Sequence, residues 1–523
     1  MKRLILLYIL VFSIVQADYL TTNGEIALFY DNKINRLKYV RGDIFQLIDI
    51  SQMGIYFKKN NEMYSMEAGS YKVIAENSNL LKIEYLIDGN KVITHIFPSV
   101  SDKRVLYMMT DTSNLNWKGD FQIIYMISPS SESVDIEFDG MYYYFGDTTS
   151  FNSINNTGLL FIAKPVEFLK FNMTPVNEKI RKNTGQRLYF FTEVKDKMQG
   201  DKLVFNFKHK NVVDYTEDNN RFLKEQHIFW NDFTKNFLGM KSLTIKELEF
   251  LKMISENNVT PQSIAYNKSL PSFQDRLRIA YILSVYGEND LVNKVVQDIS
   301  SERKNNLENI EYYLYLFKII NTGKLKIEKD VFTEVIQPNI DKSLKELLEN
   351  KDRIETESDL ENAYTLWRFL NIYKNFVQNE TSLNYMRFHF EHIGIEIKNT
   401  ILRLPGGFDN SKSIKYIEIL PSHQRIKILE TMYIHYYDKK IGVLKSSENS
   451  EIDLENNLEY TLKLYENGMT RKGDILFSRL EELIKGNKGY IVPKLQIEDE
   501  NFIGIYTYPL YLYLKIVQYR GMQ

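Results

Sequence analysis

The stretch NLENIEYYLYLFKII, residues 306–320, decides how the second half of the chain folds. It places Leu307, Ile310 and Leu314 on one stripe, and Phe317 continues that stripe along the same face. Apolar residues that recur at intervals of three and four are typical of a helix with one buried face. The same period continues to the C-terminus, so the sequence predicts a domain of about eleven helices there.

Short turns that contain glycine separate neighbouring helical segments. Gly287 and Gly468 each follow a helical run and come shortly before a polar residue that can begin the next helix. A glycine that ends one helix and a polar cap that starts the next are the signature of a helical hairpin. Repeated hairpins predict a barrel or toroid of paired helices. An α-solenoid is the alternative, but the sequence has no repeat of about 34 residues that would support it.

Residues 18 to about 215 show a different period. In KLVFNFKHK, residues 202–210, the side chains of Leu203, Phe205 and Phe207 face one way and those between them face the other. This alternation is typical of strands with one buried face, and Asp-Gly turns separate several such segments. Many short strands without a strong helix predict a β-sandwich.

The composition of the chain excludes several classes of function. Its 523 residues include 66 basic and 68 acidic side chains, and the net charge is −2. That balance lacks the basic footprint of a protein that binds nucleic acid or an anionic membrane. The chain has no cysteine, which excludes disulfides, thiolate catalysis and cysteine-based metal sites. The length favours more than one domain.

The N-terminus has the pattern of a secretory signal peptide. Two basic residues precede the apolar run Leu4–Val15, and Ala17 supplies a small residue for cleavage before Asp18. An uncleaved anchor is the alternative, but the run is short for a membrane span, and no later stretch reaches the roughly 18 apolar residues that a span needs. We therefore expect residues 1–17 to be removed and the mature protein to be exported, periplasmic or extracellular, without membrane association.

Four longer strings give a resemblance to a known family. They are FLKEQHIFWNDFTKNF (222–237), LPSFQDRLRIAYILSVYGENDLV (270–292), LPSHQRIKILETMYIHYYDKKIGVL (420–444) and YENGMTRKGDILFSRLEELIKGNKGYIVPK (465–494). In this order, with Trp230, Asp275 and Gly287 at matching positions, the chain resembles the bacterial glucoamylase-like proteins, the family-15 glycoside hydrolases. The resemblance covers most of residues 18–523.

The resemblance implies both an architecture and a ligand. The family has a β-supersandwich followed by an (α/α)6 barrel, so we expect a β-sandwich domain over 18–215, a connecting helix over 216–240 and the barrel over 241–523. The expected partner is an oligosaccharide or polysaccharide. The expected reaction is inverting hydrolysis of α-glucosidic bonds, which needs one protonated carboxyl group as acid and one ionised carboxylate that activates water.

The position of the base is altered in this sequence. The family's water-activating glutamate lies in a Pro-Glu-Gln turn, and alignment of that turn with GYIVPK puts Lys494 at the base position. A protonated ammonium group has donors and no acceptor, so it cannot take a proton from water. Glu498, Asp499 and Glu500 follow closely, and either a loop rearrangement brings one of them into the site or they form a solvated acidic turn.

The acid and the sugar-binding residues are less clearly marked. Counting back from the aromatic-Thr pair that begins at Tyr364 reaches Thr356 without a gap, and a one-residue slip reaches Glu357 or Glu355. Glu357 is the candidate acid. The alternative is a solvated glutamate in a first helical turn, where acidic residues are favourable regardless of function. Tyr364 and, one turn later, Trp367 are candidates for binding the sugar.

A second sugar-binding position lies in the string 270–292. Asp275 matches the aspartate that holds sugar hydroxyl groups in the family, but Gln274 replaces the arginine expected before it. Arg276 follows and is a candidate for the same role. As an alternative, Asp275 and Arg278 stand one helix step apart and simply pair.

Three functions remain open at this point. The first is an exported glucoamylase-type hydrolase, and the second is a catalytically degenerate relative that binds a glycan or scaffolds another protein. The third is a disaccharide phosphorylase, in which Lys494 holds the phosphate as a point charge. We expect no cofactor and no metal, because His389 and His392 lie three residues apart without an evident third ligand.

Overall fold

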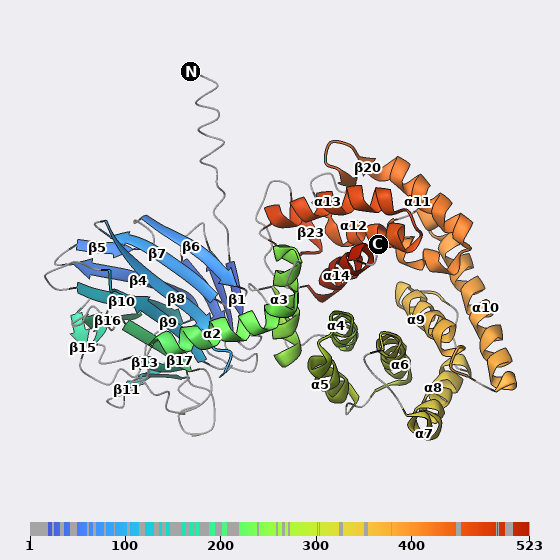
Figure 1. Ribbon diagram of the computed structural model, residues 1–523, viewed down its shortest axis with the longest axis horizontal. Helices are drawn as coiled ribbons and strands as arrows, with labels where there is room; N and C mark the ends of the chain where they lie inside the picture. Colours follow the sequence, from blue (N-terminus) through green and yellow to red (C-terminus); the bar gives the residue numbers. More distant parts are fainter. Residues whose placement is uncertain are drawn as a thin grey trace, which may run out of the picture. The chain divides into compact units, whose positions relative to one another are not determined.

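The computed structural model divides into two compact units, Met1–Ser269 and Leu270–Gln523 (Figure 1). The predicted signal peptide, residues 1–17, lies outside the residues that the structure describes. No described helix is both long and apolar enough to cross a bilayer. The described residues are 19–22, 26–31, 36–41, 50–59, 62–65, 70–77, 80–87, 89–101, 105–114, 121–129, 135–138, 143–146, 159–163, 167–170, 174–176, 188–193, 201–206, 219–237, 240–257, 260–263, 267–269, 272–300, 302, 304–323, 328–349, 354–377, 379–409, 411–445, 451–487, 489, 491–496 and 506–521.

The first unit contains two large antiparallel sheets. In the first sheet, β5 (Glu62–Ser65) pairs with β4, and the other strands follow in spatial order: β1 (Tyr19–Thr22), β2 (Ala27–Asp31), β3 (Arg36–Arg41), β4 (Ile50–Lys59), β10 (Phe121–Pro129), β16 (Leu188–Glu193), β14 (Glu167–Lys170) and β15 (Thr174–Val176). The second sheet has the order β11 (Asp135–Phe138), β12 (Tyr143–Gly146), β13 (Leu159–Ala163), β17 (Asp201–Asn206), β9 (Val105–Asp111), β8 (Asn90–Pro98), β7 (Leu80–Ile87) and β6 (Ser70–Asn77). The stretch that predicted a strand over 202–210 forms β17, which ends at Asn206.

The two sheets bury one face each against the other. In β7, Leu81, Ile83 and Tyr85 are buried and alternate with more exposed residues, as a period of two requires. The ring of Tyr85 lies edge-on to Phe57 of β4, with 4.7 Å between ring centroids. Because β4 and β7 belong to different sheets, this contact joins the two inner faces in one apolar core.

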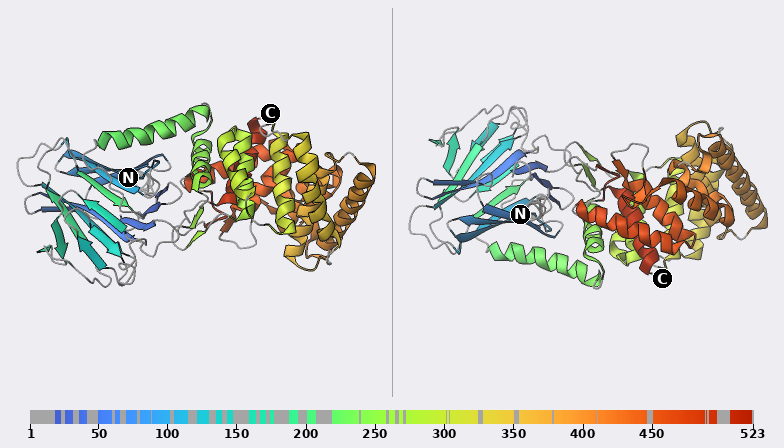
Figure 2. Two further views of the ribbon diagram at one scale, coloured as in Figure 1. Left: turned by 90° about the horizontal axis from the view of Figure 1, so that it is seen from below. Right: turned by 90° about the horizontal axis from the view of Figure 1, so that it is seen from above.

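Helix α2 (Asn219–Thr234) belongs to the first unit and runs along its sheets (Figure 2). The ring of Phe222 lies 4.6 Å from that of Tyr107 in β9, centroid to centroid. Trp230 is buried further along the helix, edge-on to Phe233. The predicted entry helix therefore packs by its aromatic face. The unit ends with η1 (Lys235–Phe237), α3 (Ser242–Asn257) and the hairpin of β18 (Thr260–Ser263) and β19 (Asn267–Ser269).

The second unit is a ring of inner helices with other helices packed outside it (Figure 1). Helix α4 packs against α6 and α14, α6 against α9, and α12 against both α14 and η4. The rings of Tyr364 in α9 and Tyr416 in η4, with centroids 5.0 Å apart, close the circle. The inner elements are α4 (Phe273–Tyr286), α6 (Asn306–Asn321), α9 (Glu357–Tyr373), η4 (Ser411–Ile419), α12 (Leu454–Glu466) and α14 (Thr507–Gly521).

Each outer helix packs against the inner element that is near it in sequence. α5 contacts α4, α8 contacts α6, α10 contacts α9, α11 contacts η4 and α12, and α13 contacts α12. The outer helices are α5 (Asn289–Ser300), α8 (Gln337–Glu349), α10 (Glu380–Arg403), α11 (Ser422–Tyr436) and α13 (Thr470–Gly486). The smaller elements are α7 (Lys329–Val331), η2 (Phe332–Ile336), η3 (Gly407–Asp409), β20 (Tyr437–Asp438), β21 (Val443–Leu444), β22 (Glu451–Asp453) and β23 (Lys494–Gln496).

Local sequence signals explain where the inner helices begin and end. Ser272 caps α4 by accepting a hydrogen bond from the backbone N–H of Asp275 at 3.1 Å. The helix ends at Gly287, whose φ of 88° is in the left-handed region that glycine adopts without strain. Thr356 caps α9 in the same way, through a capping box with Asp359. These caps satisfy backbone groups at the helix ends and so define where the inner helices begin and end.

Candidate functional site

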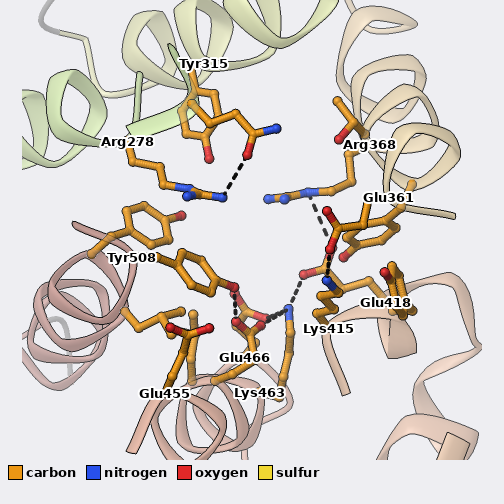
Figure 3. Close-up of a pocket in the computed structure, with 18 of the residues that line it drawn as sticks. Arg278, Tyr315, Glu361, Arg368, Lys415, Glu418, Glu455, Lys463, Glu466 and Tyr508 are labelled. Atoms are coloured by element: carbon orange, nitrogen blue, oxygen red, sulfur yellow. Dashed lines mark hydrogen bonds and ion pairs between the residues drawn. The ribbon is translucent and has the colours of Figure 1, made fainter. Parts of the chain in front are cut away.

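A polar pocket lies at the centre of the ring of inner helices (Figure 3). Its volume is about 290 Å³, at the lower end of the range for small-molecule sites. All six inner elements contribute to it. The lining residues are Gln274, Arg278, Tyr315, Glu361, Asn362, Tyr364, Thr365, Arg368, Lys415, Tyr416, Glu418, Glu455, Glu459, Leu462, Lys463, Glu466, Tyr508, Tyr511 and Leu512.

Helical spacing explains why so many charged side chains meet here. On α12, Glu455, Glu459 and Lys463 follow one another at intervals of four residues and therefore share one face of the helix. On α9, Tyr364 and Arg368 have the same spacing and both line the pocket. The inner helices thus carry a polar stripe on the side that faces the axis.

Lys463 is the centre of a buried ion-pair network. Its side chain is 4% exposed, and its Nζ lies 2.9 Å from Glu466, 3.8 Å from Glu459 and in contact with Glu418. Burial alone would raise the pKa of Glu418, but Lys463 and Arg368 outweigh it and hold this pKa well below its usual value. Glu418 is therefore a permanent anion held between two cations.

Glu455 differs from Glu418 in that its pKa is raised and not lowered. Burial, together with the nearby carboxylates of Asp453 and Glu459, raises its pKa to about 7. Its backbone N–H donates to the carbonyl oxygen of Pro493 at 3.0 Å. Glu455 therefore begins α12 beside the Pro493-Lys494 turn, the place where the resemblance puts the water-activating group.

Glu361 lines the same pocket from α9 and is bonded to the ammonium group of Lys415 from η4. Figure 3 shows Glu361 and Glu455 on different sides of the pocket. A third carboxyl group, Glu311, lies behind Gln274, whose amide donates to it at 2.5 Å. Burial raises the pKa of Glu311 to about 7. The pocket region thus combines two carboxyl groups with a pKa raised to about 7, Glu311 and Glu455, with Glu418, whose pKa is lowered.

The sequence-predicted acid and base lie apart from the pocket lining. Glu357 is the first residue of α9 and is exposed, one turn before Glu361. Lys494 is exposed at the start of β23, where it is opposite Asp453 of β22. Glu498, Asp499 and Glu500, the proposed replacements for the base, lie outside the described residues.

Of the predicted sugar-binding residues, Tyr364 lines the pocket. Trp367 is buried on the outer side of α9, where its ring stacks on Phe390 of α10 at 5.0 Å, and it is not part of the lining. A Cβ at Gly394 would come within 3.1 Å of its Nε1, so the glycine makes room for the indole.

Asp275 and Arg276 also lie outside the pocket lining. Asp275 forms an ion pair with Arg278 at 3.2 Å. This confirms the alternative expected from helical spacing, in which these two residues pair with each other. Arg276 forms a bidentate ion pair with Glu302. Gln274 and Arg278 are the residues of α4 that line the pocket.

The described residues contain no group of three or more His, Asp or Glu side chains suited to a metal ion. His389 and His392 lie on α10, where His389 packs against Tyr385 and His392 lies 3.8 Å from Glu396.

The overall structure is similar to that of a bacterial glucoamylase solved in complex with acarbose. The alignment covers 97% of this chain and 93% of that one, with 10% identity and a TM-score of 0.61. The chain therefore has a glucoamylase-like fold. This confirms, at the level of the fold, the resemblance seen in the sequence. No protein-family model and no curated protein matches the sequence.

Two other solved structures share less with this chain than the glucoamylase does. An inverting mannosidase of family GH92 from Bacteroides thetaiotaomicron is 9% identical and has a TM-score of 0.46, and the alignment covers 81% of this chain and 72% of the mannosidase. A putative kojibiose phosphorylase from the human microbiome is also 9% identical and has a TM-score of 0.31, with coverage of 97% and 86%.

Proposed function

We propose that this protein is an exported glycoside hydrolase that binds the end of an oligosaccharide in the central pocket and cleaves it with inversion. In this proposal the first unit is a β-supersandwich and the helical unit is an (α/α)6 barrel, as in the glucoamylase-like fold. The α-glucosidic bond is the first linkage to test, because the glucoamylase neighbour was solved with acarbose. The polar lining supports a ligand rich in hydroxyl groups, since tyrosine, carboxylate and guanidinium groups all bond to hydroxyls.

The observation that carries the proposal is the state of Glu455. Inverting hydrolysis needs an acid that is protonated near neutral pH, and burial supplies that condition by raising the pKa of Glu455 to about 7. We assign Glu455 as the group that gives its proton to the leaving glycosidic oxygen. Its backbone bond to Pro493 places Glu455 next to the turn at which the resemblance expects a catalytic group, although the resemblance expects the base there and we assign the acid.

Glu361 is the group that we assign as the base. Its carboxylate is bonded to the ammonium group of Lys415, and a carboxylate has the acceptor oxygens that a water-activating group needs. It reaches the pocket from α9, whereas Glu455 reaches it from α12. Water held by Glu361 attacks the anomeric carbon, while Glu455 protonates the oxygen that leaves.

Turnover of defined oligosaccharides tests this proposal. Maltotriose, trehalose and a wider panel of glycans are incubated with the full chain, and proton NMR records the anomer that is released first. An inverted anomer from any member of the panel supports hydrolysis as assigned. Release with retention contradicts the mechanism, and the absence of release from the whole panel contradicts hydrolysis itself.

A second candidate is a glycan-binding protein without turnover. It is favoured by Lys494, an exposed cation at the position where the family has its base, and by the engagement of Glu361 in an ion pair. Binding of acarbose or maltotriose without any release of sugar would establish it. The remaining alternative is a disaccharide phosphorylase. Acceleration of disaccharide cleavage by added phosphate would establish it.

A further inference from the structure

Two arginine side chains face one another across the centre of the pocket. Arg278 comes from α4 and Arg368 from α9, and their guanidinium groups point toward the same space (Figure 3). Like charges repel, so this arrangement favours a negative group between the two guanidinium groups. The question is which anion the pocket is built to hold.

Arg278 is held in place from several sides. Its Nη1 lies 3.2 Å from Asp275, its Nη2 lies 3.4 Å from Gln274, and its guanidinium plane stacks on the ring of Tyr508 at 4.4 Å. A guanidinium group has five N–H donors, and these contacts leave donors for a ligand. Arg278 is therefore a preorganised half of an anion site.

Arg368 is the less engaged of the two. Its nearest carboxylate is Glu418, 4.0 Å from Nε, and its guanidinium carbon lies 5.5 Å from the ring centre of Tyr364. Within the described part of the chain, its Nη groups have no hydrogen-bond partner. Glu418 is close to Nε and is also in contact with Lys463, while the guanidinium end of Arg368 points toward the centre of the pocket (Figure 3).

The opposite wall of the pocket, on α12, carries three glutamates together with Lys463. α12 supplies Glu455, Glu459 and Glu466 there, and Figure 3 shows Glu455 and Glu466 on the side of the pocket opposite Arg278 and Arg368. A ligand that fits both walls carries one negative group at one end and hydroxyl donors at the other. A planar carboxylate suits the first wall, because its two oxygens accept paired N–H donors from guanidinium groups.

We propose that the sugar bound in this pocket is a hexuronic acid residue, with its carboxylate between Arg278 and Arg368. This rests on the proposed function, in which the pocket holds the end of an oligosaccharide. The hydroxyl groups of the uronate face the glutamates of α12. A phosphate dianion at the same place would bring a second negative charge into a small pocket that already contains those glutamates.

A matched pair of ligands tests the proposal on the unmodified full chain. Methyl α-glucuronide and methyl α-glucoside differ only in the oxidation of C6, and titration calorimetry compares their affinities at low salt. We expect the glucuronide to bind at least tenfold more tightly, because a charge-assisted contact to two guanidinium groups replaces a neutral one. Equal affinities, or absence of binding by both, overturn the assignment of a uronate, whereas hydrolysis is judged separately by turnover of the glycan panel.

Arginine variants then show whether the preference arises at the assigned place. Arg368→Gln should remove most of the preference for the glucuronide while weak binding of the glucoside remains. Arg471→Gln, at an exposed position on α13, is the matched control and should keep the full preference. Persistence of the preference in a folded Arg368→Gln protein overturns the location. If that variant does not fold, Arg278→Lys, which keeps the charge and loses the planar fork, takes its place.

Inorganic phosphate and glucose 6-phosphate form the last arm of the experiment. Tighter binding of either than of the glucuronide contradicts a carboxylate ligand and points to a phosphate site. Displacement of the glucuronide only at much higher phosphate concentrations supports the proposal.

Discussion

The core between the two sheets of the first unit, here called the β unit, is filled by apolar side chains. The centre of the ring of inner helices is instead lined by charged and polar ones. Between the sheets, Phe57 and Tyr85 meet ring to ring among apolar neighbours. Between the inner helices, Arg278 and Arg368 face a wall of glutamates. Two flat sheets approach closely enough for side chains to fill the gap, whereas a ring of six inner elements leaves a space at its axis.

The difference shows where selection for function has acted on this chain. Buried charges cost several kcal/mol each unless they are paired and hydrogen-bonded, and apolar residues of similar volume are often as stable or more so. The β unit carries few such groups in its described core, while the ring concentrates them around one pocket. A polar centre in the ring is therefore better explained by a ligand than by stability.

Removal of the Lys463 ammonium group is the largest predicted change. Lys463→Met leaves Glu418, Glu459 and Glu466 without their shared cation, and breaking a buried pair in this way costs about 3–5 kcal/mol. Urea unfolding measures the loss, and hydrogen exchange of peptides from α12 shows where it falls.

The matched control for Lys463 is an exposed lysine. Lys472 on α13 pairs with Glu430 at 3.5 Å, and Lys472→Met should cost less than about 1 kcal/mol, as for other surface pairs. Similar losses from both lysine variants would mean that the network in the ring adds no stability beyond an ordinary surface pair.

The second prediction concerns the acid. If the chain hydrolyses glycosides, Glu455→Gln should lower kcat by a hundredfold or more while the fold is kept, since general acid catalysis contributes about 10²–10⁴. Glu357→Gln compares the acid expected from sequence with the one assigned from structure, and we expect it to lower kcat less than threefold. If Glu357→Gln abolishes turnover and Glu455→Gln does not, Glu357 is the general acid and the assignment of Glu455 is wrong.

Much of the fold was predictable from the sequence, for definite reasons. The stripe of Ile310, Leu314 and Phe317 is buried in α6, and Gly287 ends α4 with a positive φ. Both signals are local, because periodicity and a glycine after a helical run act within a few residues. The proposed domain limits and the signal peptide stay predictions.

The pocket could not be read from the sequence in the same way. Glu455 comes beside Pro493 because β22 pairs with β23 across about forty residues, and no local pattern encodes that pairing. On α9, Trp367 is the sugar-binding candidate from the sequence, whereas its neighbour Arg368 is the residue that lines the pocket. A helix turns about 100° per residue, which directs Arg368 toward the axis and Trp367 toward α10. A recurrent charged stripe, such as Glu455, Glu459 and Lys463, was the available signal.

The pH dependence of stability gives a third, smaller test. Burial raises the folded-state pKa of Glu455 to about 7, above the ordinary value of 4.5. A raised pKa means that the folded state binds the proton more tightly, so this contribution is fully present below about pH 4.5 and is lost as pH rises through about 7. Between about pH 5 and 7.5 we expect the free energy of unfolding to fall by about 2 kcal/mol from this group.

Comparison with Glu455→Gln isolates that contribution, because a neutral amide does not titrate. Glu311 has a raised pKa of the same size and sign, so the variant should flatten the pH dependence only in part. An identical pH profile in the two proteins would show that Glu455 titrates normally, and it would then be ionised at neutral pH and unsuited to the role of acid.

The smallest effect belongs to the β unit and sharpens the contrast with Lys463. The hydroxyl groups of Thr94 and Thr110 share a buried hydrogen bond of 3.0 Å between neighbouring strands. Thr110→Val leaves one hydroxyl unpaired and should cost about 1 kcal/mol, whereas the double change to valine at both positions should be nearly neutral, because both partners leave together. A comparable double substitution is not possible in the ring of inner helices, because Lys463 pairs with three carboxylates at once. Urea unfolding of the single and double variants measures the coupling, and a double variant that loses more than the single one would show that polar pairing, not apolar packing, also dominates the centre of the β unit.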